Sequence, residues 1–382
     1  MDQREYTSLA AALSEVPDPR AARGQRYPWS LLLLLIGAAV ASGQPHGRAI
    51  SQWVREHAEV LQAALDWHAP HWPSEATLRR VLRDLDVVAL EACVQQVAPP
   101  RALRAASRRR VVGQAIDGKT VRGARRHGQP MHLLSLVAHS GAVLAQTAVA
   151  AKENEIVAAP LLLAGRDLRG TLTTMDALHT QRTFAEQIRE QGGHYLMVVK
   201  DNQPTLAQAI ATLFADAPWL SDERAAEYGV HRTTEKGHGR IETRTLEASP
   251  SLNHWLDWPD VGQVLRRTCR RVDARTGEIQ QAVMLGITSL PFAPRRVAHL
   301  EEYWRGHWSI ENKVHYVRDV TLGEDRGQAH TGATAQSLAA LRNAILTLIR
   351  ATRWRYVADA IRHYAASPRR ALELIGVPIG GL

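Results

Sequence analysis

Three acidic residues, far apart in the sequence, stand in patterns that could bring them to one place. Asp117 follows the apolar run 111–116 and precedes Gly118, which predicts a buried strand that ends at a carboxylate. Asp176 ends a second strand-like run, and Glu311 lies within a long helical pattern. Three carboxylates with few neutralising partners make a hard-oxygen site suited to Mg²⁺ or Mn²⁺. Taken alone, Asp117 would fit equally well as a turn aspartate, with Gly118 in the turn.

Composition indicates a folded chain with an anionic partner. The sequence has 382 residues, 45% of them hydrophobic, and a formal net charge of +9. This basic balance favours a polyanion, although a membrane surface would also fit the charge. Cys93 and Cys269 form no metal-ligand spacing, so a reduced cytosolic protein is the simplest interpretation. The apolar run 31–41 is too short to span a bilayer, and we interpret it as a buried helix.

Residues 1–100 have the periodicity of an all-helical unit. Ser74 is a candidate N-cap for a helix that carries Arg79, Arg80 and Arg83, and these arginines would either bind phosphates or form a solvated helix face. Residues 101–110 hold a dense run of arginines with strong potential to bind phosphate.

Strand-like and helical patterns alternate in the next hundred residues. Three strands come first, with Ser140-Gly141 as a hairpin turn between the second and the third. A helix, the Asp176 strand, a second helix and a last strand follow, and this order describes a ribonuclease-H-like fold with a mixed sheet. The predicted strands are 111–117, 131–139, 142–150, 171–176 and 195–200, and the predicted helices are 155–164 and 180–190.

The regular order then stops, and a β-rich insertion is expected before the helix that carries Glu311. The fold class is therefore α/β, with a ribonuclease-H-like catalytic core, a β-rich insertion and an all-helical N-terminal domain. We divide the chain into a helical domain 1–100, a first core segment 101–204, the insertion 205–295, the final core helices 296–352, and a C-terminal helix and tail 353–382. Predicted elements in the second half are helices 205–214, 297–317, 336–350 and 354–364, and strands 238–246, 261–271 and 281–288.

An ordered series of short motifs runs through most of the chain. These motifs are Ala115–Thr120, Lys152–Ile156, Thr174–Ala177, Lys200–Pro204, His238–Arg244 and His307–Asn312, followed by His315, Asp319–Thr321 and Glu324–Asp325. Together they resemble the DDE transposases of bacterial insertion sequences, in the branch of the H-repeat-associated proteins. The N-terminal part, through Pro73-Ser74 and Arg80, is similar to the helical domain that precedes the catalytic domain in this branch. Trp304, His307 and Arg318 stand where related transposases carry tyrosine, arginine and lysine around the glutamate.

The resemblance implies a catalytic and metal-binding triad of Asp117, Asp176 and Glu311. It implies two Mg²⁺ or Mn²⁺ ions, which such sites hold roughly 3.5–4 Å apart, with Asp117 bridging them. The expected activity is metal-dependent cleavage of double-stranded DNA at the element's terminal repeats and strand transfer into target DNA. We expect no membrane association, a homodimer in the DNA complex, and a cytoplasmic, nucleoid-associated bacterial protein. Candidate DNA contacts are Arg108, Arg109, Arg110, Lys119, Arg122, Lys200, Asn202, Gln203, Arg240, Arg244, His307 and Arg318.

Two other functions fit the same sequence: a domesticated DNA-binding protein that no longer transposes, and a stand-alone nuclease of the same fold. Several residues also have structural alternatives. His307 would make a polar contact or order the glutamate instead of touching DNA, and Arg240 and Arg244 would lie on a solvated strand. Trp304 and Trp308 are expected in the core. The apolar positions of the 336–350 helix would pack in the core or contribute to a dimer contact.

Overall fold

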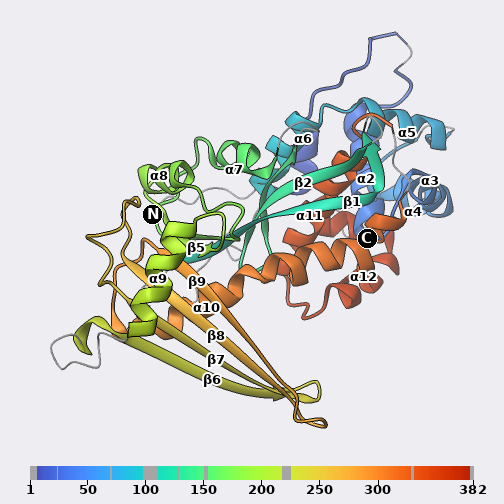
Figure 1. Cartoon of the computed structure of the whole chain (residues 1–382). Helices are drawn as coiled ribbons and strands as arrows, with labels where there is room; N and C mark the ends of the chain where they lie inside the picture. The colour runs from blue at the N-terminus through green and yellow to red at the C-terminus, as the bar shows by residue number, and fades with distance from the viewer. Residues whose placement is uncertain are drawn as a thin grey trace. The chain divides into compact units, whose positions relative to one another are not determined.

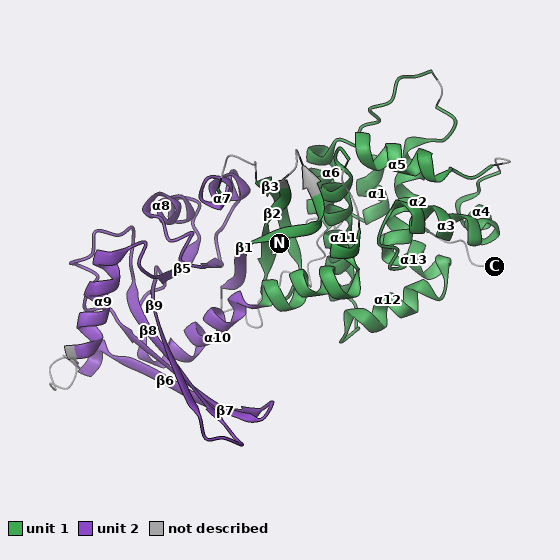
Figure 2. Ribbon diagram, turned by 45° about the vertical axis from the view of Figure 1, so that its right-hand side comes forward, with its two compact units in different colours: residues 1–104, 118–154, 309–382 green, residues 105–117, 155–308 purple. Residues whose placement is uncertain are grey.

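The computed structural model describes residues 7–23, 25–68, 71–97, 111–126, 129–149, 154–216, 225–327 and 331–378 (Figure 1). The chain forms two compact units (Figure 2). Unit 1 combines three stretches, Met1–Arg104, Gly118–Asn154 and Ser309–Leu382, and unit 2 combines Ala105–Asp117 with Glu155–Trp308. The division into five segments made from the sequence stays a prediction.

Unit 1 begins with a set of helices around the apolar run 31–41. That run forms α2, Trp29–Ala41, whose side chains are almost all buried, so the predicted buried helix is confirmed. The helix stops before Gly43, whose φ of 80° is accessible to glycine at little cost. Ser74 caps the N-terminus of α5, Glu75–Asp84, by accepting a hydrogen bond from the backbone N–H of Thr77 at 3.3 Å, as predicted. The other helices here are α1 Leu9–Ser14, α3 Gly47–Glu56, α4 Ala58–Leu65, α5 Glu75–Asp84 and α6 Val87–Val94.

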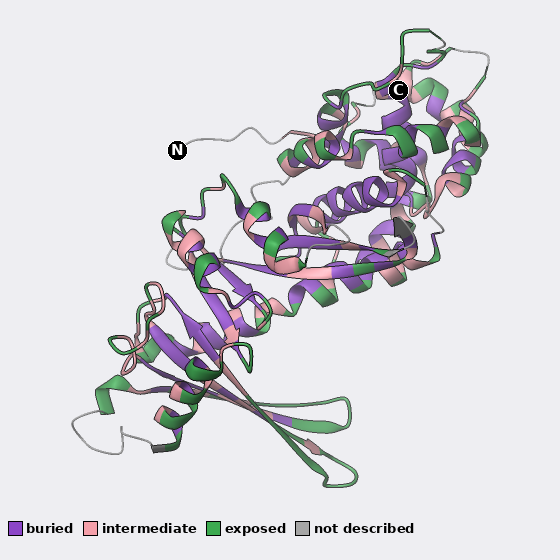
Figure 3. Ribbon diagram, turned by 45° about the horizontal axis from the view of Figure 1, so that its top comes forward, coloured by how far each residue is buried: buried purple, intermediate pink, exposed green. Residues whose placement is uncertain are grey.

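The remainder of unit 1 is a hairpin with helices packed against it. Strands β2 (Gln129–Ala138) and β3 (Val143–Val149) pair antiparallel as predicted, and Gly141 takes a φ of 98° in the turn. Helix α11, Thr334–Ala351, is buried along nearly its whole length (Figure 3), which favours the core-packing alternative for its apolar positions. Helix α12 spans Val357–Ala365, and a further helix that the sequence did not predict, α13, spans Pro368–Ile375. The last residues, 379–382, lie outside the described residues.

A buried carboxyl group links three elements of unit 1. Glu91 on α6 is only 7% exposed and accepts hydrogen bonds from Gln146 Nε2 at 2.9 Å and Gln336 Nε2 at 3.0 Å. Burial raises the pKa of Glu91 to about 6, although the two hydrogen bonds oppose the shift. Folding therefore favours the protonated form of this group. Its contribution to stability is fully present below the ordinary pKa of a glutamate and is lost as the pH rises through about 6.

We expect Glu91→Gln to remove a pH-dependent loss of stability. The glutamine oxygen can still accept both hydrogen bonds but carries no buried charge. Between pH 4.5 and pH 7.5, this group should lower the free energy of unfolding of the wild type by about 2 kcal/mol. The variant should show no such loss. Denaturant unfolding of both proteins across this pH range checks the prediction. A stability difference between the two proteins that is constant from pH 4.5 to 7.5 would contradict it.

Strand β1, Val112–Arg126, contributes to both units because the boundary falls after Asp117. The sequence predicted that this strand would end at Asp117, and that prediction is wrong: the strand continues to Arg126. The reason is a change of partner. The first residues pair with β4, Thr171–Met175, in parallel register only as far as Ala115, and β2 lies on the other side of β1 in the strand order. Hydrogen bonds to a second neighbour allow the strand to continue where the first partner ends.

In unit 2 the strands follow the order β1-β4-β5-β9-β8-β7-β6. Strands β1, β4 and β5 are parallel, and β5 pairs antiparallel with β9, so the β-rich segment extends the sheet of this unit. Besides the start of β1, the strands of unit 2 are β4 Thr171–Met175, β5 His194–Val199, β6 Gly229–Gly237, β7 Arg240–Ser249, β8 Gln263–Asp273 and β9 Ile279–Thr288. The helices of unit 2 are α7 Glu155–Leu163, α8 Arg182–Glu190, α9 Pro204–Asp216 and α10 Val297–His307.

The β-rich segment differs from its prediction in two respects. Strand β6 was not predicted, and His238 does not begin a strand but forms the turn between β6 and β7 with Gly239. Both turn residues have positive φ, 49° and 72°, which suits a tight hairpin. The turn-proximal end of β6 is exposed, as is the beginning of β9 (Figure 3). The apolar residues that anchor the segment therefore lie at the opposite ends of these strands.

Helix α10 packs on the sheet of unit 2 through Trp304, which is 3% exposed and lies in a cluster with Leu265 and Leu300. The predicted core position of Trp304 is confirmed. Trp308, at the end of this helix, is 62% exposed, so the same prediction for Trp308 is wrong. The reason is that α10 ends at His307, so Trp308 is the residue that follows the helix and is not part of the helix face that packs on the sheet. The chain then changes to π-helical geometry over 311–315 and 317–321.

Candidate active site

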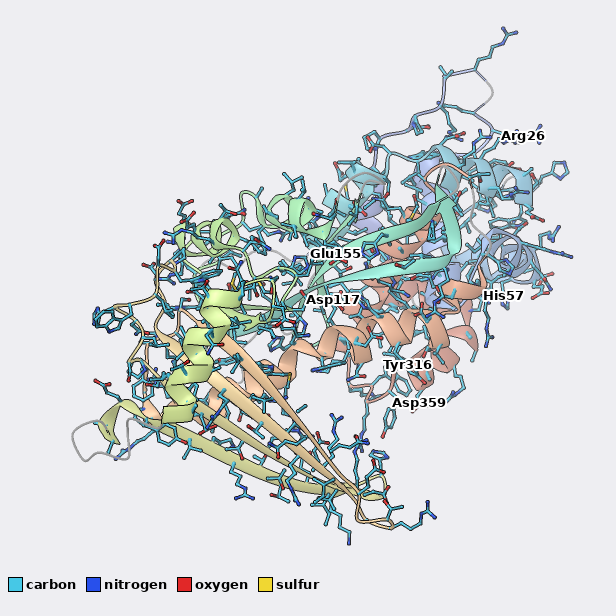
Figure 4. All side chains as sticks on the ribbon, viewed as in Figure 1. Arg26, His57, Asp117, Glu155, Tyr316 and Asp359 are labelled. Atoms are coloured by element: carbon cyan, nitrogen blue, oxygen red, sulfur yellow. The ribbon has the colours of Figure 1, made fainter. Side chains whose placement is uncertain are left out.

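Two neighbouring parallel strands of unit 2 carry the two predicted aspartates. Strands β1 and β4 are in register through the pair Ala115 and Thr174, and each aspartate lies two residues further along its own strand direction. Both aspartates therefore follow closely after the carboxyl end of this pairing, on neighbouring strands. Asp176 follows the last residue of β4 and is exposed, whereas Asp117 is half-buried. Figure 4 labels Asp117 on β1.

The loop after Asp176 is held by hydrogen bonds. The hydroxyl of Thr180 donates to the backbone carbonyl oxygens of Asp176, at 3.2 Å, and Val198, at 2.6 Å. The Asn202 side-chain amide donates to the carbonyl of Ala177 at 2.6 Å, and the Gln203 amide donates to that of Thr180 at 3.0 Å. Both amides were predicted to contact DNA. Their geometry gives them a different task, because they fix the loop that presents Asp176.

His307 lies against β4, with Nδ1 3.3 Å from the Thr174 hydroxyl. Burial lowers the pKa of His307 below its ordinary value, although the neighbouring Asp176 opposes the shift. A half-buried, neutral imidazole is a weak partner for a phosphate. The structural-contact alternative is therefore the one that this geometry favours.

Glu311 begins a π-helical turn in unit 1, and its carboxylate contacts a histidine of the same turn. Glu311 Oε2 lies 3.1 Å from His315 Nδ1, and His315 is 3% exposed. The hydrogen bond with His315 holds the pKa of Glu311 below its ordinary range, and the charge of Lys119 acts in the same direction, although burial opposes both. Glu311 is thus an ionised carboxylate at neutral pH. π-helical turns recur at functional sites, where they redirect side chains.

The sequence did not predict the role of His315 beside Glu311. His315 appeared only as part of a family motif, although its spacing of four residues from Glu311 was visible. An i, i+4 pair meets on one face of a helix, so this spacing is the signal that could have identified the contact.

Lys119 was predicted to contact DNA, and its surroundings contradict this. The side chain is 7% exposed, and Nζ lies 2.7 Å from the Asp319 carboxylate and 4.0 Å from Asp325 Oδ1. A buried ammonium that is already paired has no free donor facing solvent. Lys119 instead places a positive charge near Glu311, which is the effect on the pKa described above.

Two predicted arginine contacts are also corrected. Arg318 is fully buried and makes a two-pronged ion pair with Glu324, with both N···O distances at 2.9 Å. Arg244 is 11% exposed and pairs with Glu235 at 3.0 Å and Glu242 at 2.9 Å. Because their guanidinium groups are occupied inside the protein, neither is available as a phosphate fork.

Other candidates retain accessible charges. The side chain of Arg122 is 85% exposed and lies 3.9 Å from Asp325, and that of Arg240 is 48% exposed and lies 3.8 Å from Glu242. Lys200 is exposed at the end of β5. Arg108, Arg109 and Arg110 lie outside the described residues. Arg122, Arg240 and Lys200 therefore stay candidate phosphate contacts.

Among the helices of the described residues, we find none with the length and apolar character needed to cross a membrane.

Comparisons with known proteins cover nearly the whole chain. Residues 107–348 match the family model described as the transposase DDE domain, and residues 10–98 match the model described as DDE_Tnp_1-associated. The "H repeat-associated putative transposase YhhI" of Escherichia coli (strain K12) is 29% identical over 357 residues, which is 90% of this chain and 91% of the relative. The "Putative transposase YncI" of Escherichia coli O157:H7 is 28% identical over 352 residues, which is 90% of this chain and 87% of the relative.

Proposed function

The chain belongs to the DDE transposases, in their H-repeat-associated branch, and on that premise we propose that it binds the ends of a DNA element, cuts them and joins them to target DNA. The observation that supports this proposal is the parallel register of β1 and β4, whose pairing ends two residues before both Asp117 and Asp176. Two ionised carboxylates carried by adjacent parallel strands repel each other when they lie close together. A cation bound between the two carboxylates would offset this repulsion.

We assign the core to the ribonuclease-H-like fold. In support, β2 and β3 form an antiparallel hairpin, and β1, β4 and β5 are parallel neighbours with α7 and α8 as the connections. This order agrees with the alternation of strands and helices read from the sequence. In this fold Asp117 lies on β1 and Asp176 directly follows β4.

Glu311 is the third carboxylate of the proposed triad. Chain continuity supports this, because Lys119 is two residues beyond Asp117 in β1, about 7 Å along the strand, and its charge acts on Glu311 within unit 1. The donor set is three carboxylates, of which Asp176 and Glu311 are exposed, and this fits Mg²⁺ or Mn²⁺. We propose that Asp117, Asp176 and Glu311 hold two such ions. When bound, divalent cations there would polarise the scissile phosphate and lower the pKa of an attacking water.

The protein's own residues then have defined tasks. Strands β1 and β4 fix two carboxylates, and His315 and Lys119 keep Glu311 ionised. In cleavage, a water oxygen forms a new bond to phosphorus while the bond to the 3′-oxygen breaks, which leaves a 3′-hydroxyl. In strand transfer that hydroxyl attacks a phosphodiester of the target, whose own 3′-oxygen leaves. Arg122, Lys200 and Arg240 are the proposed phosphate contacts that counter the repulsion between the acidic site and DNA.

We further propose that two copies of the chain act together in the cytoplasm on nucleoid DNA. An element has two ends, the sequence carries one triad, and closed two-fold symmetry is the commonest way to pair identical chains. Mixing Glu311→Gln chains with wild type should then suppress joining of two ends more than nicking of one end. Joining that falls only in proportion to the wild-type fraction would contradict a paired assembly.

Incubation of the protein with Mg²⁺ and labelled element ends tests the proposed function. A transposase yields ends joined to target DNA, and this is the expected product. Cut ends without joining would assign the chain to the stand-alone nucleases. A mobility shift without cleavage would assign it to the domesticated DNA-binding proteins, and either outcome would overturn the proposal.

A further inference from the structure

Unit 1 contains a concave pocket whose lining residues include none of the three carboxylates. Its volume is about 420 Å³, which is within the range of ligand sites. Both family segments contribute to it: the start of α3 and one face of α5 come from the N-terminal segment, and a turn at 324–326 and the start of α11 come from the catalytic segment. A ligand in this pocket would contact both parts of the protein at once.

Three exposed arginines, Arg48, Arg79 and Arg326, line the pocket. Among the described residues, none of the three makes an ion pair with an acidic group, in contrast to nearby Arg83, whose Nε lies 2.6 Å from Asp84 Oδ1. Three guanidinium groups around one hollow repel each other unless an anion lies between them. Guanidinium groups also present several donors that match phosphate oxygens.

The acidic residues that line the same pocket do not cancel this charge. Glu324 is 2% exposed, and its carboxylate is occupied by Arg318 and by Arg342, whose Nη1 lies 3.0 Å away. Glu75, at the start of α5, is the other acid that lines the pocket. One carboxylate beside three unpaired arginines leaves the pocket positively charged.

The pocket wall is held in place before any ligand arrives. Arg342 Nη2 donates to the carbonyl of Pro45 at 2.5 Å, which ties the start of α3 to α11. The N–H of Ala333 donates to the carbonyl of Arg83 at 3.0 Å, which ties α5 to the segment before α11. The Arg122 N–H donates to Asp325 at 3.1 Å, which anchors to β1 the turn that presents Arg326. An anion would therefore bind without first ordering the pocket, and that favours affinity.

We infer that this pocket binds a backbone phosphate of DNA through Arg48, Arg79 and Arg326. The occupant is a phosphodiester of the duplex and not a free anion, because the chain has an excess of positive charge and the pocket joins both segments of a transposase. The inference rests on the proposed function and adds a DNA-holding site separate from the triad. It also gives the N-terminal helical segment a specific task.

Salt titration of DNA binding tests the site, with Arg48→Gln, Arg79→Gln and Arg326→Gln in the full chain. Each lost phosphate contact should reduce the slope of log affinity against log salt by about 0.9. The matched control is Arg55→Gln, which removes an exposed arginine from the same helix as Arg48 but outside the pocket. The control should keep the wild-type slope. Wild-type slopes in all three pocket variants, or an equal loss in the control, would overturn the inference.

Two further experiments identify the ligand of the pocket, and their outcomes distinguish a failure of this inference from a failure of the proposed function. A neutral methylphosphonate at one backbone position should weaken wild-type binding several-fold, and should add no further loss in Arg79→Gln if that arginine contacts that phosphate. Inorganic phosphate at constant ionic strength should not displace the duplex, and displacement would assign the pocket to a small anion. Normal joining activity with unchanged slopes would overturn the pocket alone, whereas absence of DNA binding by the wild type would overturn the proposed function as well.

Discussion

Asp117→Asn, Asp176→Asn and Glu311→Gln should each reduce DNA cleavage by about 10³-fold or more. Each change removes a ligating charge and almost no volume, and a catalytic metal supplies several kcal/mol of transition-state stabilisation at about 1.4 kcal/mol per tenfold in rate. Cleavage of labelled element ends in Mg²⁺, measured as initial rates, checks the prediction. Because the three carboxylates are not proposed to hold the DNA, duplex affinity in the absence of metal should stay the same or rise.

Each of the three variants tests the role of its own residue. Cleavage within a few-fold of wild type by any one variant would remove that residue from the triad. His315→Gln serves as a graded comparison, because the glutamine amide can still donate a hydrogen bond to Glu311. It should lose much less activity than Glu311→Gln. An equal loss would show that the histidine itself is required for the chemistry.

Glu324→Gln should lower the free energy of unfolding by about 3–5 kcal/mol. The change leaves Arg318 and Arg342, 0% and 3% exposed, as buried charges without their shared counter-ion. Burial alone would raise the pKa of Glu324, but the two arginines hold it below its ordinary value. Its contribution is therefore present at neutral pH and is lost as the pH falls through that depressed pKa. Denaturant unfolding at pH 7 gives the stability difference directly.

Glu186→Gln is the matched control for this change. Glu186 makes an exposed i, i+4 pair with Arg182 in α8, and such pairs contribute about 0.3–0.5 kcal/mol. The same chemical substitution should thus have little effect there. A loss of under about 1 kcal/mol in Glu324→Gln would contradict the view that Glu324 compensates the buried charges of Arg318 and Arg342.

Local signals in the sequence were sufficient to predict that a strand ends next to Asp176. An apolar run that stops at a carboxylate is visible within a few residues, and β4 with Asp176 follows that pattern. The continuation of β1 beyond Asp117 was missed because Gly118 was read as the end of the strand, whereas β1 continues to Arg126 beside its neighbour β2. Strand β6 was missed because its outer residues are exposed and polar, which leaves no period-two pattern to detect.

Charged residues were the least predictable part of the candidate site. Arg318 and Lys119 were read as DNA contacts because basic side chains are mostly exposed, yet both are buried against acidic partners. Arg318 pairs with Glu324 and Lys119 pairs with Asp319. Only the fold shows that these side chains meet. The π-helical turns at Glu311 were equally hidden, because the apolar spacing that suggested one helix does not reveal a change of period.

Binding of Mn²⁺, followed by its electron paramagnetic resonance signal, tests the proposed metal site without relying on catalysis. The wild type should bind Mn²⁺ in competition with Mg²⁺, and each of Asp117→Asn, Asp176→Asn and Glu311→Gln should weaken that binding by at least about tenfold, as loss of even an outer partner of a metal ligand can do. Weaker binding in all three variants would support a single site made by these carboxylates. Unchanged Mn²⁺ affinity in Glu311→Gln, with weakened affinity in the two aspartate variants, would contradict it.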